Sequence, residues 1–151
     1  GVADTVRVAK YTLATGLFTP MGTGANDAVY ALVVDPATGD VFAGGSFTTM
    51  SGTTVNRIAK WDYSSQAWET VGKNGSVGVN GIVYSLTQSP QGVVYLGGAF
   101  TAATDSTVLN YIAKYTPGQS APIKNMGSGV NAEVVSRSAG DTNISFAYPD
   151  G

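Results

Sequence analysis

Three kinds of side chain that can bind ligands recur along the chain at intervals of about 50 residues, a spacing typical of repeat architectures. The first kind is a lysine that follows an apolar residue and an alanine: Lys10, Lys60 and Lys114. Arranged around a ring, these ammonium groups would form a circle that binds an anion or the carboxylate of a glycan. Alternatively, each lysine covers an apolar neighbour with its methylene groups and keeps its charge in water.

Aromatic residues form the second kind, and Trp61 and Trp68 could stack against sugar rings. Aromatic residues occupy the matching repeat positions elsewhere, at Tyr11, Phe18 and Tyr115. A repeated position serves the repeated fold, so this register favours packing between neighbouring units over sugar binding. Tyr63 lies outside the register, in an expected loop, and is therefore the better candidate for an exposed binding contact.

The third kind is an asparagine that closes a Gly-x-Asn unit just before an apolar run: Asn26, Asn80 and Asn131. If that run is the innermost strand of each unit, the three amides gather near the centre of a ring and could donate hydrogen bonds to a ligand. The alternative is structural, because asparagine next to glycine forms turns through its side chain or a left-handed backbone.

The residue types needed for most catalytic sites are missing. The sequence contains no histidine and no cysteine, which removes the commonest general base and the thiolate metal ligands. The carboxylates show no pairing suited to glycoside hydrolysis, and Asp35 and Asp40 flank an expected turn. The spacing of the acidic residues does not match a calcium loop. We therefore expect no enzymatic activity, no cofactor and no metal.

Charge and hydropathy exclude two further classes of partner. The net charge is −2, with only eight lysines and arginines in the chain, so we expect no binding to nucleic acid. The longest apolar run, residues 29–34, is far shorter than the ~20 residues that a membrane helix requires. We therefore expect no membrane insertion. Because no start methionine precedes Gly1, we also expect that the chain is processed or belongs to a longer polypeptide.

The elements that would position these residues are short strands. β-Branched and aromatic residues, separated by turns rich in glycine, proline and aspartate, predict four strands in one unit, at residues 29–35, 41–43, 57–61 and 67–71. In the third of them, alternation places Ile58 and Lys60 on one face and Ala59 and Trp61 on the other. Four short antiparallel strands per unit, without helical periodicity, predict an all-β fold made of β-propeller-type blades.

The same pattern divides the chain into units. Residues 27–72 and 81–127 supply two whole blades, residues 5–22 supply the last two strands of one, and residues 132–138 begin another. Residues 1–138 thus amount to about three blade equivalents, two whole and two partial. Residues 139–151 diverge, although residues 143–148 could form one more strand.

The repeats resemble a known family. A double glycine, Gly44-Gly45, ends the second strand, and Trp61 and Trp68 follow with six residues between them, as in Kelch repeats. The third copy departs, because Tyr115 is followed by Ile123 after seven residues, which predicts a wider loop. The amino-acid sequence of the repeats is similar to that of repeats in secreted bacterial and virion surface proteins. The resemblance implies a propeller, a fold that enzymes, adaptors, lectin-like modules and viral surface proteins all use.

A propeller closes with roughly four to eight blades, so about three cannot form a ring. We therefore expect that further chain or oligomerisation completes the ring, and that the partners are copies of the chain or neighbouring subunits. The leading hypothesis is a non-catalytic structural or attachment module of an extracellular, cell-surface or virion assembly. The second is a glycan-binding, lectin-like propeller. The third is the scaffold domain of a larger enzyme whose chemistry lies outside these residues.

Overall fold

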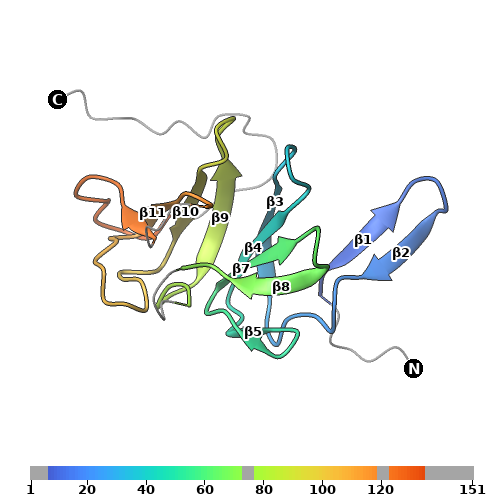
Figure 1. Cartoon of the computed structure of the whole chain (residues 1–151). Helices are drawn as coiled ribbons and strands as arrows, with labels where there is room; N and C mark the ends of the chain where they lie inside the picture. The colour runs from blue at the N-terminus through green and yellow to red at the C-terminus, as the bar shows by residue number, and fades with distance from the viewer. Residues whose placement is uncertain (1–6, 73–76, 119–122, 135–151) are drawn as a thin grey trace.

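The computed structural model describes residues 7–72, 77–118 and 123–134, and every regular element in these ranges is a β-strand. Two four-stranded antiparallel sheets stand side by side, and a two-stranded hairpin precedes them (Figure 1). The prediction of an all-β fold with four-stranded antiparallel sheets is thus confirmed. The candidate strand at 143–148 and most of the predicted unit at 132–138 lie outside the described residues.

The N-terminal hairpin consists of β1 (Ala9–Thr12) and β2 (Leu17–Pro20). Tyr11 pairs with Phe18 across the two strands, and Gly16 supplies the positive φ of 70° that the connecting turn needs. In Figure 1 the hairpin projects away from the rest of the molecule, beside β8. By repeat position, β1 and β2 correspond to the third and fourth strands of a four-stranded sheet, which agrees with the sequence pattern.

The first sheet has the strand order β3-β4-β7-β8. Its strands are β3 (Val29–Val34), β4 (Val41–Gly45), β7 (Ile58–Asp62) and β8 (Ala67–Thr70). Between β4 and β7 the chain forms a small extra hairpin, β5 (Thr49–Met50) and β6 (Thr53–Thr54). The sequence pattern did not predict this hairpin, because threonine and serine make the stretch polar while Met50, which is buried, is its one large apolar residue before Val55.

The second sheet repeats the arrangement with the strand order β9-β10-β11-β12. Its strands are β9 (Val83–Gln88), β10 (Val94–Gly98), β11 (Ile112–Tyr115) and β12 (Lys124–Asn125). The outermost strand, β12, is shorter than β8, and a longer connection precedes it. This is the place where the sequence predicted a wider loop.

Strand alternation divides the buried residues between two interfaces. In the first sheet, Phe42 and Ile58 belong to the cluster shared with the second sheet, where β9 packs against β3 and β4. Ala43, Ala59 and Trp61 belong to the cluster shared with the hairpin. The first sheet therefore contributes buried residues to two interfaces, each with a different neighbour.

The double glycines let the sheets approach closely. A Cβ atom built on Gly44 would lie 2.6 Å from Cγ1 of Val83, and one on Gly97 would lie 2.8 Å from Cγ1 of Val134. Real Cβ atoms do not come this near to another carbon, so any residue larger than glycine would push the strands apart. Val83, on the first strand of the second sheet, and Val134 thus rest on the bare backbone of the second strand of the unit before them.

Candidate functional site

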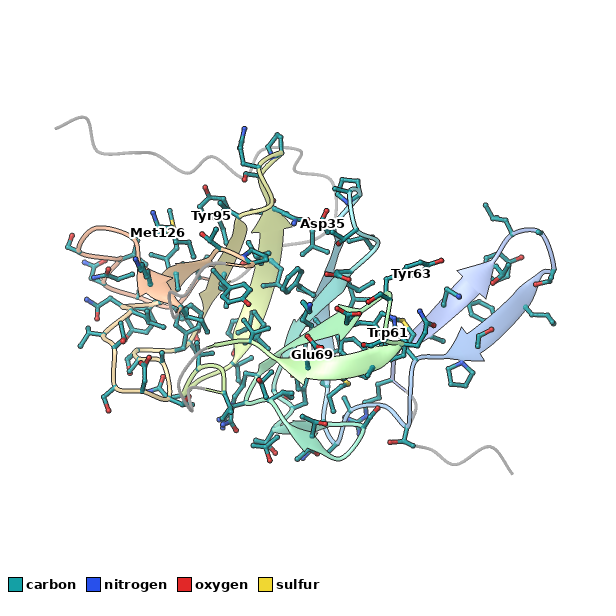
Figure 2. The ribbon with its side chains drawn as sticks, viewed as in Figure 1. Asp35, Trp61, Tyr63, Glu69, Tyr95 and Met126 are labelled. Carbon is teal, nitrogen blue, oxygen red and sulfur yellow. The ribbon has the colours of Figure 1, made fainter. Side chains whose placement is uncertain are left out.

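A hollow of about 390 Å³ opens between the N-terminal hairpin and the first sheet. We call it the hairpin pocket; its wall includes Lys10, Pro20 and Met21 from the hairpin and Leu32, Val34, Trp61 and Tyr63 from the first sheet. Figure 2 shows Trp61 and Tyr63 close to the point where the hairpin meets the first sheet. The pocket is mostly apolar, and its polar lining residues are Lys10, Thr19, Tyr63 and Gln66.

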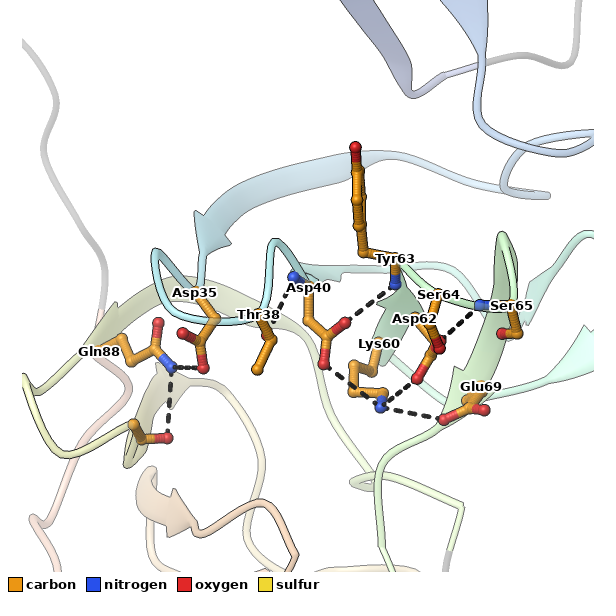
Figure 3. A network of polar contacts seen from close by, with 11 residues as sticks. Asp35, Thr38, Asp40, Lys60, Asp62, Tyr63, Ser64, Ser65, Glu69 and Gln88 are labelled. Carbon is orange, nitrogen blue, oxygen red and sulfur yellow. Dashed lines mark hydrogen bonds and ion pairs between the residues drawn. The ribbon is translucent and has the colours of Figure 1, made fainter.

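Three residues singled out from the sequence, Lys10, Trp61 and Tyr63, meet at this pocket. Tyr63 follows β7 in a tight turn and is about half exposed, as predicted, because its side chain points away from the sheet (Figure 3). Its backbone N–H donates to Oδ1 of Asp40 over 2.9 Å, which fixes the turn in place. The ring is therefore available for contact while the backbone beneath it is held.

Trp61 and Trp68 are buried and pack against each other. Their ring centroids lie 5.4 Å apart at an interplanar angle of 66°, the edge-to-face arrangement that aromatic rings favour. The indole Nε1 of Trp68 donates to the backbone oxygen of Met21 over 2.8 Å, which ties the first sheet to the end of the hairpin. The structure therefore uses both tryptophans for packing between units.

Lys60 lies on the opposite face of β7, among three carboxylates (Figure 3). Its Nζ is 3.1 Å from Oε2 of Glu69, 3.3 Å from Oδ2 of Asp62 and 3.5 Å from Oδ2 of Asp40. Burial alone would lower the pKa of Lys60, but the hydrogen bonds to Glu69 and Asp62 and the charge of Asp40 raise it above the usual value. The charge of Lys60 is thus balanced by carboxylates of the same unit.

Asp62 also organises the turn between β7 and β8. Its Oδ1 accepts hydrogen bonds from the hydroxyl of Ser64, at 2.6 Å, and from the backbone N–H of Ser65, at 2.7 Å. These donors, with Lys60, hold the pKa of the Asp62 carboxyl well below its usual range. The carboxylate is thus part of the turn and of the Lys60 cluster at once.

The other two lysines lie in different surroundings. Lys10 is exposed on β1 at the wall of the hairpin pocket, and Lys114 is exposed on β11. The three lysines share a repeat position but not an environment, because their neighbours across the sheets differ. A circle of ammonium groups in a closed ring stays a prediction.

Asn26 and Asn80 form the same set of hydrogen bonds in two units. Oδ1 of Asn26 accepts from the backbone N–H groups of Thr48 and Thr49, at 2.9 and 3.0 Å, and its Nδ2 donates to Oγ1 of Thr48. Asn80 makes the corresponding bonds with Thr101 and the residue after it. Each amide thus holds the loop that follows the second strand of its unit, and the binding role suggested for these residues stays a prediction.

Asn131 lies elsewhere, at an open hollow of about 600 Å³. Asn110, Tyr111 and Ser128 line the same hollow, and Nδ2 of Asn110 donates to the backbone oxygen of Ser128 over 2.9 Å. Asn26 and Asn80 bond to residues that follow them in their own units. The corresponding residues for Asn131 lie outside the described part of the chain.

A polar contact joins the two sheets. Nε2 of Gln88, on β9, donates to Oδ2 of Asp35 over 2.9 Å and to the backbone oxygen of Gly92 (Figure 3). The backbone N–H of Ala37 donates to Oδ1 of Asp35 and contributes most to lowering the pKa of this carboxyl. The sequence predicted Asp35 as a turn residue; its contact with the second sheet gave no sequence signal, because Gln88 is 53 positions away.

The sequence pattern also missed a group of exposed apolar side chains. Leu32 and Val34 point outward from β3, and Leu17 and Phe18 are exposed on β2. The apolar run at 29–34 predicted a strand without indicating which of its side chains are exposed, because exposure depends on the strands that cover it. Leu32 and Val34 line the hairpin pocket, whereas Leu17 and Phe18 do not.

Within residues 7–72, 77–118 and 123–134, no group of three or more acidic residues is arranged to hold a metal ion. Over the same ranges, no helix has the length and hydropathy needed to span a membrane.

Two four-stranded antiparallel sheets, the second of which rests its first strand on the second strand of the first, have the arrangement of blades in a β-propeller. The chain belongs to the family of the Rax2 C-terminal beta propeller domain, whose model matches residues 9–144. A search among curated proteins found no match. The prediction of a β-propeller is confirmed, whereas the likeness to Kelch repeats stays a prediction.

Proposed function

We propose that the chain is a non-catalytic structural module of an extracellular, cell-surface or virion assembly, and that it acts by associating with other subunits. The observation that carries this proposal is the exposure of large apolar side chains at two places: Leu32 and Val34 at the wall of the hairpin pocket, and Tyr11, Leu17 and Phe18 on the hairpin itself. Large apolar side chains exposed together on a soluble protein commonly mark an interaction surface.

The way the chain uses its polar residues supports a structural role. The carboxylates of Asp40, Asp62 and Glu69 neutralise Lys60, and the amides of Asn26 and Asn80 hold loops. The full sequence has neither histidine nor cysteine to provide a general base or a thiolate nucleophile. The extracellular or virion setting rests on the likeness of the repeats to secreted and virion surface proteins.

Light scattering and sedimentation velocity on the isolated chain test the proposal. We expect a defined oligomer at high micromolar concentration. Because apolar contacts are not screened by salt, this oligomer should persist at high ionic strength. A folded monomer under all these conditions would contradict the proposal.

A second candidate function is glycan binding at the hairpin pocket. One observation favours it: the half-exposed ring of Tyr63 lies beside Lys10 and Trp61 at the same hollow, which offers a stacking surface and a cation. A glycan array with the chain and its Tyr63→Ala variant tests this function. Hits that disappear in the variant support it, and an array without hits removes it.

A further inference from the structure

Two of the three repeated lysines differ in whether a carboxylate accompanies them. On the first sheet, Lys60 pairs across the strands with Glu69, and the residue two positions after it is Asp62; both carboxylates contact its Nζ (Figure 3). On the N-terminal hairpin, Lys10 pairs across the strands with Thr19, and the residue two positions after it is again a threonine. Among the described residues, no acidic side chain forms an ion pair with Lys10.

This lysine borders an apolar space. Lys10 lines the hairpin pocket, and it is the one charged residue among the described residues of the pocket wall. Val8, Met21 and Trp61 form the buried part of that wall, and Leu32 adds an exposed apolar side chain. A hollow of about 390 Å³ with a mostly apolar wall and a few polar groups has the size and lining of a small-molecule site.

Tyr63 supplies a fixed aromatic surface at the same pocket. A Cβ atom built on Gly39 would lie 3.1 Å from Cγ of Tyr63, so the ring rests on the bare backbone of Gly39. Nε2 of Gln66, which also lines the pocket, donates to the backbone oxygen of Tyr63. These contacts hold the residue in place although it is about half exposed. A side chain that is ordered before binding loses little entropy when a ligand packs on it.

We propose that the hairpin pocket binds a small amphipathic anion, which is a carboxylate attached to an apolar chain or ring. The apolar body lies against Leu32, Trp61 and Tyr63, and the carboxylate forms an ion pair with Lys10. Burial of the apolar body provides most of the affinity. The ion pair provides the selection for an anion over a neutral ligand of the same shape.

This inference goes beyond subunit association and does not depend on it, because the ligand contacts a single copy of the chain. It also differs from glycan binding at the same pocket. A sugar would bring many hydroxyl groups to a wall that is mostly apolar, and burying hydroxyl groups without partners is costly.

An NMR titration of the isotope-labelled chain with three probes separates the two parts of the ligand. Hexanoate has the charge and the apolar body, hexan-1-ol has the apolar body alone, and glucuronate has the charge on a polar body. We expect hexanoate to bind roughly fivefold more tightly than hexan-1-ol, the upper range for an exposed ion pair. High salt should reduce this preference by screening the ion pair. Glucuronate should cause no saturable shifts at the pocket.

Removing the charge tests the role of the lysine. Lys10→Met keeps an unbranched side chain without the ammonium group, so hexanoate and hexan-1-ol should then bind with equal affinity. Lys114→Met is the matched control, because Lys114 has the same repeat position and is also exposed but does not line the pocket. This control variant should keep the preference for hexanoate.

A polar residue in the wall tests the apolar contact. Leu32→Ser should weaken the binding of hexanoate and hexan-1-ol alike, by roughly fivefold, since it removes apolar surface from the contact. Val108→Ser is the control, because Val108 is 60% exposed and lies outside the pocket, whereas Leu32 is 53% exposed. The dispersion of the NMR spectra checks that each variant keeps the fold.

The outcomes distinguish this inference from the proposed functions. If hexanoate does not bind, if its shifts lie outside the pocket, or if Lys10→Met keeps the preference, the amphipathic anion is wrong. Subunit association, measured by sedimentation without a probe, then still stands. If glucuronate or neutral sugars bind instead, and Tyr63→Ala abolishes their binding, the glycan function stands and this inference is overturned.

Discussion

Two aromatic pairs occupy the same position in successive units, but one pair is exposed and the other is buried. Tyr11 and Phe18 face each other across the hairpin with ring centroids 4.8 Å apart, and Trp61 and Trp68 do so across the first sheet at 5.4 Å. Tyr11 is 49% and Phe18 73% exposed, whereas Trp61 is 7% and Trp68 5% exposed. The repeat sequence therefore determines that the two rings pair, and the adjacent unit determines whether the pair is buried.

The comparison shows how stability is distributed in this chain. The hairpin covers the pair on the first sheet, and no described unit covers the pair on the hairpin. In repeat architectures each unit contributes its own stability plus the energy of its interfaces. Among the residues that the structure describes, the hairpin has one interface where the first sheet has two, so the same substitution should have different effects in the two places.

The largest effect is expected from truncating the buried pair. Trp68→Ala removes a buried indole and its hydrogen bond to Met21, and should lower the free energy of unfolding by about 3–5 kcal/mol. Phe18→Ala, at the matching position, should change it by less than about 0.5 kcal/mol in dilute solution. Urea unfolding followed by fluorescence and circular dichroism measures both. Equal losses would contradict the claim that the neighbour decides burial.

An intermediate effect is expected at the contact between the sheets. Gly44→Ala brings a methyl group against Cγ1 of Val83 and should cost about 1–3 kcal/mol by overpacking. In a Val83→Ala background the same substitution should cost less, because the opposing methyl group is gone. A double-mutant cycle measures this coupling. Additive effects would show that Gly44 serves some purpose other than close approach.

The smallest effect concerns acid and belongs to the first sheet alone. The pKa of Asp62 is lowered in the folded chain, so its contribution to stability is complete above the unfolded pKa of about 4 and is lost as the pH falls below it. Asp62→Asn should therefore reduce the acid-induced fall of the urea midpoint, and Ser64→Ala should reduce it partly, since the Ser64 hydroxyl is the strongest contributor to the shift.

Thr12, the counterpart of Asp62 in the hairpin, offers the matched control. It carries no charge, and its backbone oxygen accepts the turn hydrogen bonds from Thr15 and Gly16. Thr12→Val should leave the pH dependence of the urea midpoint unchanged. If Asp62→Asn and Thr12→Val behave alike, the acid sensitivity does not come from the turn between β7 and β8.

Much of the architecture was predictable because the repeats carry it. The recurrence of Ile58-Ala59-Lys60 and of Gly44-Gly45 predicted equivalent strands in equivalent sheets, and alternation assigned Ile58 and Trp61 to opposite faces. The hairpin β5–β6 escaped prediction, since strands of two residues leave no periodicity to detect. Local patterns predict elements only when they are long enough to alternate.

The candidate site was less predictable, because it depends on which neighbours are present. Lys10 and Lys60 have the same local sequence, yet one lines an open pocket and the other is enclosed by three carboxylates. The exposure of Leu32 follows from the strands that flank β3, and its own sequence, which resembles that around the partly buried Leu86, gives no sign of it. Sequence repeats predict positions, and the neighbouring units decide how those positions are used.

The glycine contact also has a consequence for curvature. Near the first strand of the second sheet, Gly44 leaves only a hydrogen atom between the sheets, whereas further out the ring of Tyr115 occupies the gap. The gap between the first and second sheets is thus narrow at one side and wide at the other, and this difference sets the angle between them. A single methyl group added at Gly44 would therefore change that angle as well as the local packing.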